Sequence, residues 1–137
     1  MEARGFFETT EGLNAAPMLR VGIGFGRGLV VAASALIDTG ADVCVFPASL
    51  FPWPVPGRGE PDIVLELADG TQVTAPIRYP SITAGDIRET AVASAILPGV
   101  PPILGRSFLN RLDLRVAASR GLVRLETVRG SRAAAGD

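Results

Sequence analysis

Residues 35–42, with the sequence ALIDTGAD, are the most informative stretch of the chain. An apolar run ends directly at the carboxylate of Asp38, and the hydroxyl of Thr39 and the glycine Gly40 follow. A charge at the end of a buried strand loses hydration, so its neighbours must supply hydrogen-bond donors or a partner. Thr39 can donate through its hydroxyl, and Gly40 allows the backbone to approach the carboxylate closely. Among the 14 acidic residues, Asp38 therefore has the setting best suited to catalysis.

One carboxylate of this kind is only half of a catalytic site. Two facing carboxylates that share one proton can act together as base and acid, because like charges in contact cannot both be ionised. Such a pair can activate a water molecule against a peptide carbonyl and return a proton to the leaving nitrogen.

The residue types that are missing from the chain exclude most other catalytic sites. The 137 residues suffice for one domain with a core and are too few for two. All 13 basic residues are Arg, and Lys and His are absent. Without His there is no Ser-His-Asp or Cys-His site, and without Lys there is no Schiff base. The one cysteine, Cys44, lies among apolar residues and is predicted to be a small core residue.

Charge and hydropathy narrow the range of partners. The formal net charge is −1 and the arginines are spread along the chain, which argues against a nucleic-acid partner. Mean hydropathy is high at +0.33, yet no apolar run approaches the ~20 residues that span a bilayer. We therefore expect no membrane span. The N-terminus lacks the pattern of a signal peptide, which favours a cytoplasmic location, although removal of a leader would leave the same sequence.

The pattern of apolar residues predicts a mostly β chain with one or two short helices. Residues 1–16 show no periodicity and are expected to form a flexible arm before a domain at 17–128, with a disordered tail at 129–137. Ser107 is predicted to cap a helix at 108–112, and 47–50 to form a helical turn. The expected strands are 19–25, 29–37, 43–46, 63–67, 71–77, 89–96, 112–116 and 122–127, and residues 103–104 are expected to be buried.

The hairpin over residues 63–77 is the clearest local pattern. Residues 63–67 alternate, and an extended pattern resumes at Thr71 after Asp69-Gly70. This dipeptide between two strands favours a type I′ turn, because Gly tolerates the positive φ that the turn requires.

These motifs together resemble the retropepsin-like aspartic proteases. Residues 36–42 are similar to the active-site strand of that family, and Ile103-Leu104-Gly105-Arg106 is similar to its second conserved strand. The segment LGRSFL, residues 104–109, matches the bacterial single-domain members. The resemblance covers residues 19–127 and implies an all-β, single-domain, closed retropepsin-like fold with one short helix in its C-terminal half. It also implies a flap hairpin whose tip is Leu67, Ala68, Asp69, Gly70, Thr71 and Gln72.

By the same resemblance, each site residue has an expected role. Asp38 is the catalytic aspartate, and Thr39, Gly40 and Ala41 support its loop. Asp42 and Arg106 match an ion pair that supports the substrate cleft, and their opposite charges give this pairing an independent reason.

The number of motifs implies a homodimer. The chain has no second Asp-Thr-Gly or Asp-Ser-Gly, so the active unit needs Asp38 from each of two copies at a two-fold axis. The predicted function is a homodimeric aspartic endopeptidase acting on polypeptide, with no cofactor and no metal. The alternatives are a non-catalytic dimerisation or peptide-binding module on the same fold, and a plain turn at residues 38–40.

Overall fold

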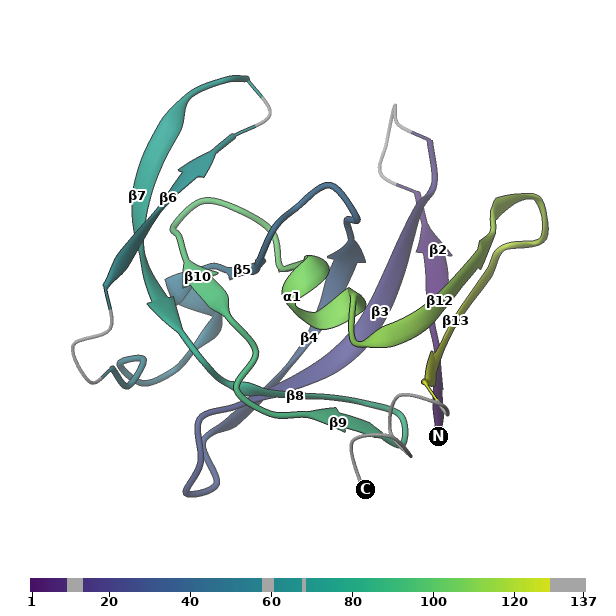
Figure 1. The fold of residues 1–137 in the computed structure, drawn as a ribbon, viewed down its shortest axis with the longest axis horizontal. Helices are drawn as coiled ribbons and strands as arrows, with labels where there is room; N and C mark the ends of the chain where they lie inside the picture. Colours follow the sequence, from purple (N-terminus) through teal and green to yellow (C-terminus); the bar gives the residue numbers. More distant parts are fainter. Residues whose placement is uncertain (10–13, 58–60, 68, 129–137) are drawn as a thin grey trace.

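The computed structural model describes residues 1–9, 14–57, 61–67 and 69–128, which form two β-sheets and short helical segments (Figure 1). The strands are β1 Glu2–Arg4, β2 Phe6–Glu8, β3 Ala16–Gly24, β4 Val30–Ile37, β5 Cys44–Phe46, β6 Asp62–Glu66, β7 Gln72–Arg78, β8 Ser81–Ala84, β9 Ile87–Glu89, β10 Ser94–Ile96, β11 Ile103–Leu104, β12 Leu112–Ala117 and β13 Leu122–Thr127. The helical segments are the 3-10 helices η1 Ala48–Leu50 and η2 Ala118–Arg120 and the α-helix α1 Arg106–Leu109. The all-β prediction is confirmed. None of the helices in the described ranges is long and apolar enough to cross a membrane.

The strand order places the end of β4 inside the larger sheet. The order is β6-β7-β10-β5-β11-β4-β3-β8-β9, with β2 also paired to β3, and β1-β13-β12 form the second sheet. Strand β11 runs parallel to β4, with Leu104 opposite Ile37, and antiparallel to β5. The strand that leads to Asp38 therefore has β11 on one side and β3 on the other.

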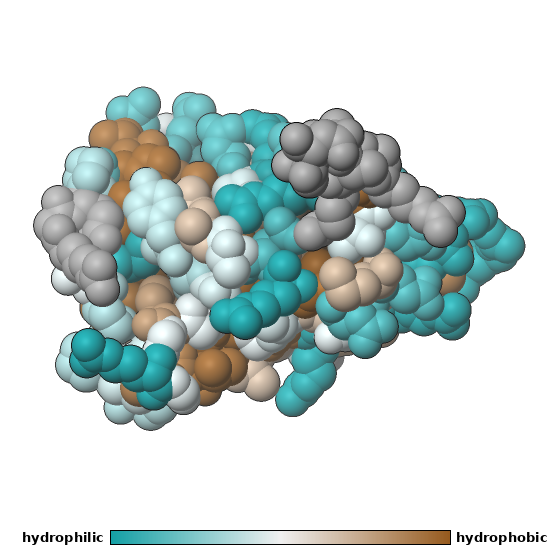
Figure 2. Space-filling model, turned by 60° about the horizontal axis from the view of Figure 1, so that its bottom comes forward, coloured by the Kyte–Doolittle hydropathy of each residue, from teal (hydrophilic) through white to brown (hydrophobic). Residues whose placement is uncertain are grey.

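The buried apolar residues form two clusters, and the first contains residues of both sheets. Leu19, Val21 and Ile23 alternate along β3 and are almost fully buried in the first cluster. Each such side chain contributes about 1.5–3 kcal/mol when it is fully buried. The second cluster, under the β6–β7 hairpin, contains Val43, Val45, Ala75, Ala95 and Leu97. On the face shown in Figure 2, hydrophobic side chains occur in small groups separated by hydrophilic ones.

The predicted hairpins β3–β4, β6–β7 and β12–β13 are confirmed, but one turn differs. Leu67 N–H donates to Thr71 O at 2.7 Å, and Gly70 N–H donates to Leu67 O at 2.9 Å. Gly70 has a φ of 86°, and the bond between Leu67 and Thr71 leaves three residues in the loop. The type I′ prediction is therefore wrong, because that turn joins its two strands through a two-residue loop.

The region before β10 also differs from the expected single strand at 89–96. Strand β9 ends at Glu89 and β10 begins at Ser94, and Ala91 between them has a φ of 51°. A non-glycine residue in this conformation breaks an extended strand. Strand β8, which was not predicted, forms a hairpin with β9 around Gly85.

The N-terminus forms strands where the sequence predicts a flexible arm. Strand β1 pairs with β13, with Ala3 opposite Leu125 and buried, and β2 pairs with β3. Three-residue strands carry too little periodicity to be recognised, and their partners lie far away in the sequence. The tail predicted at 129–137 lies outside the described residues.

Candidate active site

Asp38 directly follows β4, and neighbouring backbone groups hold it there. Its N–H donates to Leu104 O at 3.0 Å, and Leu36 N–H donates to Pro102 O at 2.9 Å. The side chain is half-buried, whereas Thr39 and Gly40 are exposed. The β11 segment therefore determines where the carboxylate stands.

Gly40 supplies the hydrogen bond to the carboxylate that its position predicts. Its N–H donates to Asp38 Oδ1 at 2.9 Å, and a Cβ at residue 40 would lie 3.2 Å from the same oxygen. Among the described residues, no other donates a hydrogen bond to this carboxylate. One oxygen of the carboxylate is thus oriented by the backbone.

Asp42 and Arg106 form the ion pair that their charges predict. Arg106 Nη2 contacts Asp42 Oδ1, and Arg106 Nη1 donates to Thr39 O at 3.2 Å. One guanidinium therefore ties both ends of the Asp38 loop to the start of α1. Both side chains remain substantially exposed, so their pairing contributes at most about 1 kcal/mol to stability.

Backbone contacts fix the same loop more firmly. Arg106 N–H donates to Ala41 O at 2.8 Å, and Ser107 N–H donates to Asp42 O at 3.1 Å. Gly105 is buried beneath the loop, and a Cβ there would lie 2.6 Å from the carbonyl carbon of Val43 and 2.8 Å from Ala41 O. Only glycine lets α1 approach the loop this closely.

Ser107 has a different role from the predicted helix cap. Gly105 occupies the N-cap position of α1, and no side chain caps the helix. The Ser107 hydroxyl donates to Ala93 O at 2.7 Å and accepts a hydrogen bond from Cys44 N–H at 3.1 Å. It therefore links α1 to β5 and to the segment before β10. This role was not predicted, although Ser107 lies within the segment LGRSFL.

Cys44 is a core residue, as predicted. The residue is fully buried and is not part of a disulfide. Burial raises the pKa of the Cys44 thiol, although the Ser107 hydroxyl opposes the shift. The thiol is therefore protonated and shielded from solvent.

A cleft of about 530 Å³ separates the Asp38 loop from β6. Its carboxylates are Asp38, Asp42 and Glu66, and its other lining residues are small or aliphatic: Gly40, Ala41, Val43, Val45, Ile63, Val64, Leu65, Leu67, Leu97, Val100 and Ile103. Figure 1 shows the β6–β7 hairpin standing out from the rest of the fold, with β6 on the side of β4. The predicted flap thus lies across the cleft from the predicted catalytic residue.

The predicted tip residues take different places in this hairpin. Leu67 lines the cleft, whereas Asp69 and Gly70 form the turn, and Thr71 and Gln72 lead into β7. Thr71 N–H donates to Asp69 Oδ1 at 2.9 Å, which lowers the pKa of the Asp69 carboxyl. Ala68 lies outside the described residues.

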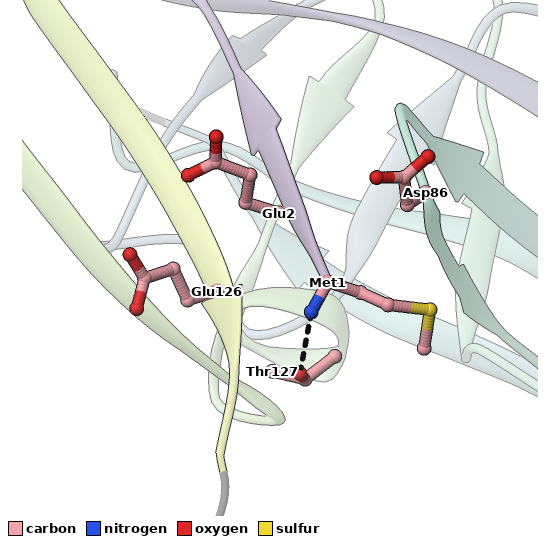
Figure 3. Close-up of a pocket in the computed structure, with 5 residues that line it drawn as sticks. All are labelled: Met1, Glu2, Asp86, Glu126 and Thr127. Atoms are coloured by element: carbon pink, nitrogen blue, oxygen red, sulfur yellow. Dashed lines mark hydrogen bonds between the residues drawn. The ribbon is translucent and has the colours of Figure 1, made fainter.

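A second hollow of about 460 Å³ lies at the N-terminus and does not include the Asp38 loop. Figure 3 shows the carboxylates of Glu2 and Glu126 on one side of Met1 and Asp86 on the other. The Met1 amino group donates to Thr127 Oγ1 at 3.4 Å. Within the described ranges, no group of three or more Cys, Asp or Glu residues is arranged to hold a metal ion. The cleft at Asp38 is therefore the candidate active site.

The comparisons with known proteins agree with this geometry. A model of the retroviral aspartyl protease family matches residues 13–117. The fold is similar to the crystal structure of a retropepsin-like aspartic protease from Rickettsia conorii, with a TM-score of 0.59 and 15% sequence identity over 91% of this chain and 90% of that one. No curated protein sequence matches. The retropepsin-like, single-domain fold expected from the motifs is confirmed, and the chain belongs to the retroviral aspartyl protease family.

Proposed function

We propose that the protein is a homodimeric aspartic endopeptidase in which Asp38 of each copy forms one half of a catalytic dyad. The position of the Asp38 carboxylate carries the proposal: it lies in a cleft beneath β6, and Gly40 N–H orients one of its oxygens. Membership of an aspartic protease family supports this chemistry. The second carboxylate comes from a second copy because the chain has a single Asp-Thr-Gly motif.

In the proposed mechanism the two Asp38 carboxyls share one proton. The ionised carboxylate accepts a proton from a water molecule as the water oxygen attacks the carbonyl carbon of the substrate peptide bond. The protonated carboxyl donates its proton as the carbonyl oxygen develops negative charge. When the C–N bond of the tetrahedral intermediate breaks, the leaving nitrogen accepts a proton from the dyad. No covalent bond to the enzyme forms.

The free edge of β6 supports binding of an extended peptide. Strand β6 is the last strand of its sheet, so one edge has no partner strand in the described chain. In an antiparallel pair, the N–H and C=O groups of successive residues point alternately toward and away from the partner strand. Those of Leu67 point toward β7, because Leu67 N–H donates to Thr71 O. Those of Glu66 and Val64 therefore point away from β7. Pro76, which has no N–H, lies opposite Asp62, as this alternation requires. A peptide strand can add to this edge through backbone hydrogen bonds.

The test is cleavage of a peptide library by the wild type, Asp38→Asn and Asp86→Asn. Asp38→Asn keeps the shape of the side chain and removes its acid-base function, which typically contributes about 10²- to 10⁴-fold in rate. We expect a loss of that size for Asp38→Asn, with unchanged folding and dimer formation. Asp86→Asn is the matched control, because it makes the same change outside the cleft, and it should cleave as the wild type does.

Two results would contradict the proposal. If Asp38→Asn cleaves the library at the wild-type rate, the dyad mechanism is wrong. If the wild type forms a stable dimer by analytical ultracentrifugation and binds peptides without cutting any, the protein is a peptide-binding module. A specific activity that rises steeply with protein concentration would show that active sites assemble from two copies.

A further inference from the structure

The outer face of β6 carries a regular pattern of exposed side chains. Asp62, Val64 and Glu66 alternate with Ile63 and Leu65, which are half-buried against the core. Val64 is 62% exposed. Val64 and Glu66 both line the cleft. The exposed face of the flap strand therefore presents an aliphatic and an acidic side chain two residues apart.

Glu66 has no ion-pair partner among the described residues. The neighbouring strand β7 offers Gln72, Thr74 and Pro76 on its exposed positions, all of them uncharged. The described lining of the cleft contains three carboxylates and no cation. Arg106, the cation near this cleft, contacts Asp42 and Thr39 O. A negative charge at Glu66 is thus available to a bound peptide.

The backbone of the same strand determines which peptide residues meet these side chains. Because the N–H and C=O groups of Val64 and Glu66 point to the free edge, an added antiparallel strand places a residue directly opposite each of them. Side chains of directly opposite residues lie on the same face, with Cβ atoms about 4.5–5.5 Å apart. Two peptide residues, spaced two positions apart, therefore contact Val64 and Glu66.

We infer that Glu66 is a specificity-determining residue that selects a basic side chain in the substrate, two positions from an apolar residue that contacts Val64. The inference rests on the proposed peptidase function and names the class of peptide that the cleft takes. An exposed opposite-charge pair across two strands is worth about 0.2–1 kcal/mol, which corresponds to about a 1.4- to 5-fold preference in kcat/KM. Salt weakens this preference, because the charges are exposed to solvent.

The experiment scans Lys, norleucine and Glu through every position of a cleaved peptide and measures kcat/KM for each. The wild type should prefer Lys over norleucine, and norleucine over Glu, by about 1.4- to 5-fold at one position. Glu66→Gln should remove this preference, and Glu66→Lys should reverse it. The matched control is Asp113→Lys, the same type of charge reversal on exposed β12 outside the cleft, which should keep the preference.

The outcomes separate this inference from the proposed function. If the wild type cleaves and Glu66→Lys keeps the wild-type order of Lys, norleucine and Glu at every position, the inference is overturned and the peptidase function stands. If Asp113→Lys also reverses the preference, the preference comes from the net charge of the protein, and the inference is overturned. If the wild type cleaves no peptide, the proposed function itself fails.

Discussion

Replacing Gly105 with Ala tests whether the close approach of α1 determines the position of the Asp38 loop. The new Cβ would lie 2.6 Å from the carbonyl carbon of Val43 and 2.8 Å from Ala41 O, closer than real Cβ contacts allow. Both atoms belong to backbone, so no flexible side chain can move aside. We expect the loop and α1 to separate, which weakens the bonds that Arg106 N–H and Ser107 N–H donate to Ala41 O and Asp42 O.

The expected change in the free energy of unfolding combines two opposing effects. Inserting a methyl group into a tightly packed site costs about 1–3 kcal/mol. Gly105 has a φ of −102° and a ψ of −172°, which Ala adopts without strain. Ala also lowers the conformational entropy of the unfolded chain, which raises the free energy of unfolding by about 0.4–1 kcal/mol. We therefore expect a net loss of about 1–2 kcal/mol in the free energy of unfolding, from the difference of these terms.

Urea denaturation of the wild type, Gly105→Ala and Gly24→Ala measures this difference, with the m-value as a check on two-state unfolding. Gly24→Ala is the matched control, because its nearest neighbours to an added Cβ are 3.4 Å and 4.0 Å away. It should raise the free energy of unfolding by about 0.4–1 kcal/mol, because it restricts the unfolded chain in the same way without creating a close contact. If Gly105→Ala is as stable as the control variant and cleaves peptides at the wild-type rate, the contact does not position the loop.

Three further predictions concern residues that do not line the cleft. Ser107→Ala should lower the free energy of unfolding by about 1–3 kcal/mol, because the partly buried Cys44 N–H loses its acceptor. Urea denaturation measures this loss, and Ser107→Thr is the control that keeps the hydroxyl. Ala91→Gly should raise the thermal midpoint, because Ala91 has a φ of 51° that glycine adopts without strain; a lowered midpoint would refute this. Because burial raises the pKa of Cys44, the folded state keeps its proton longer than the unfolded state, so stability should fall as the pH rises above about 8.5. Urea titrations at several pH values should show this slope in the wild type and not in Cys44→Ala.

The main features of the fold were predictable because they depend on local patterns. The alternation of Leu19, Val21 and Ile23 predicts a strand with one buried face, and all three are buried in β3. The wrong predictions concern features that neighbours in space decide. Ala91 keeps its unusual φ while Arg111 donates to Thr90 O and Ala91 O at 2.7 and 3.1 Å. No pattern within residues 89–96 indicates that contact.

For the candidate site, residue types and their spacing indicated which side chains could take part, and the tertiary structure determined how they are arranged. Asp38, Gly40 and the opposite charges of Asp42 and Arg106 were evident from residue types and spacing, because the function of a carboxylate depends on its immediate neighbours. The contacts of Ser107 with Ala93 and Cys44 became evident only in the folded chain. So did the free edge of β6 and the exposure of Glu66, because strand order and ladder register depend on pairing between segments far apart in the sequence.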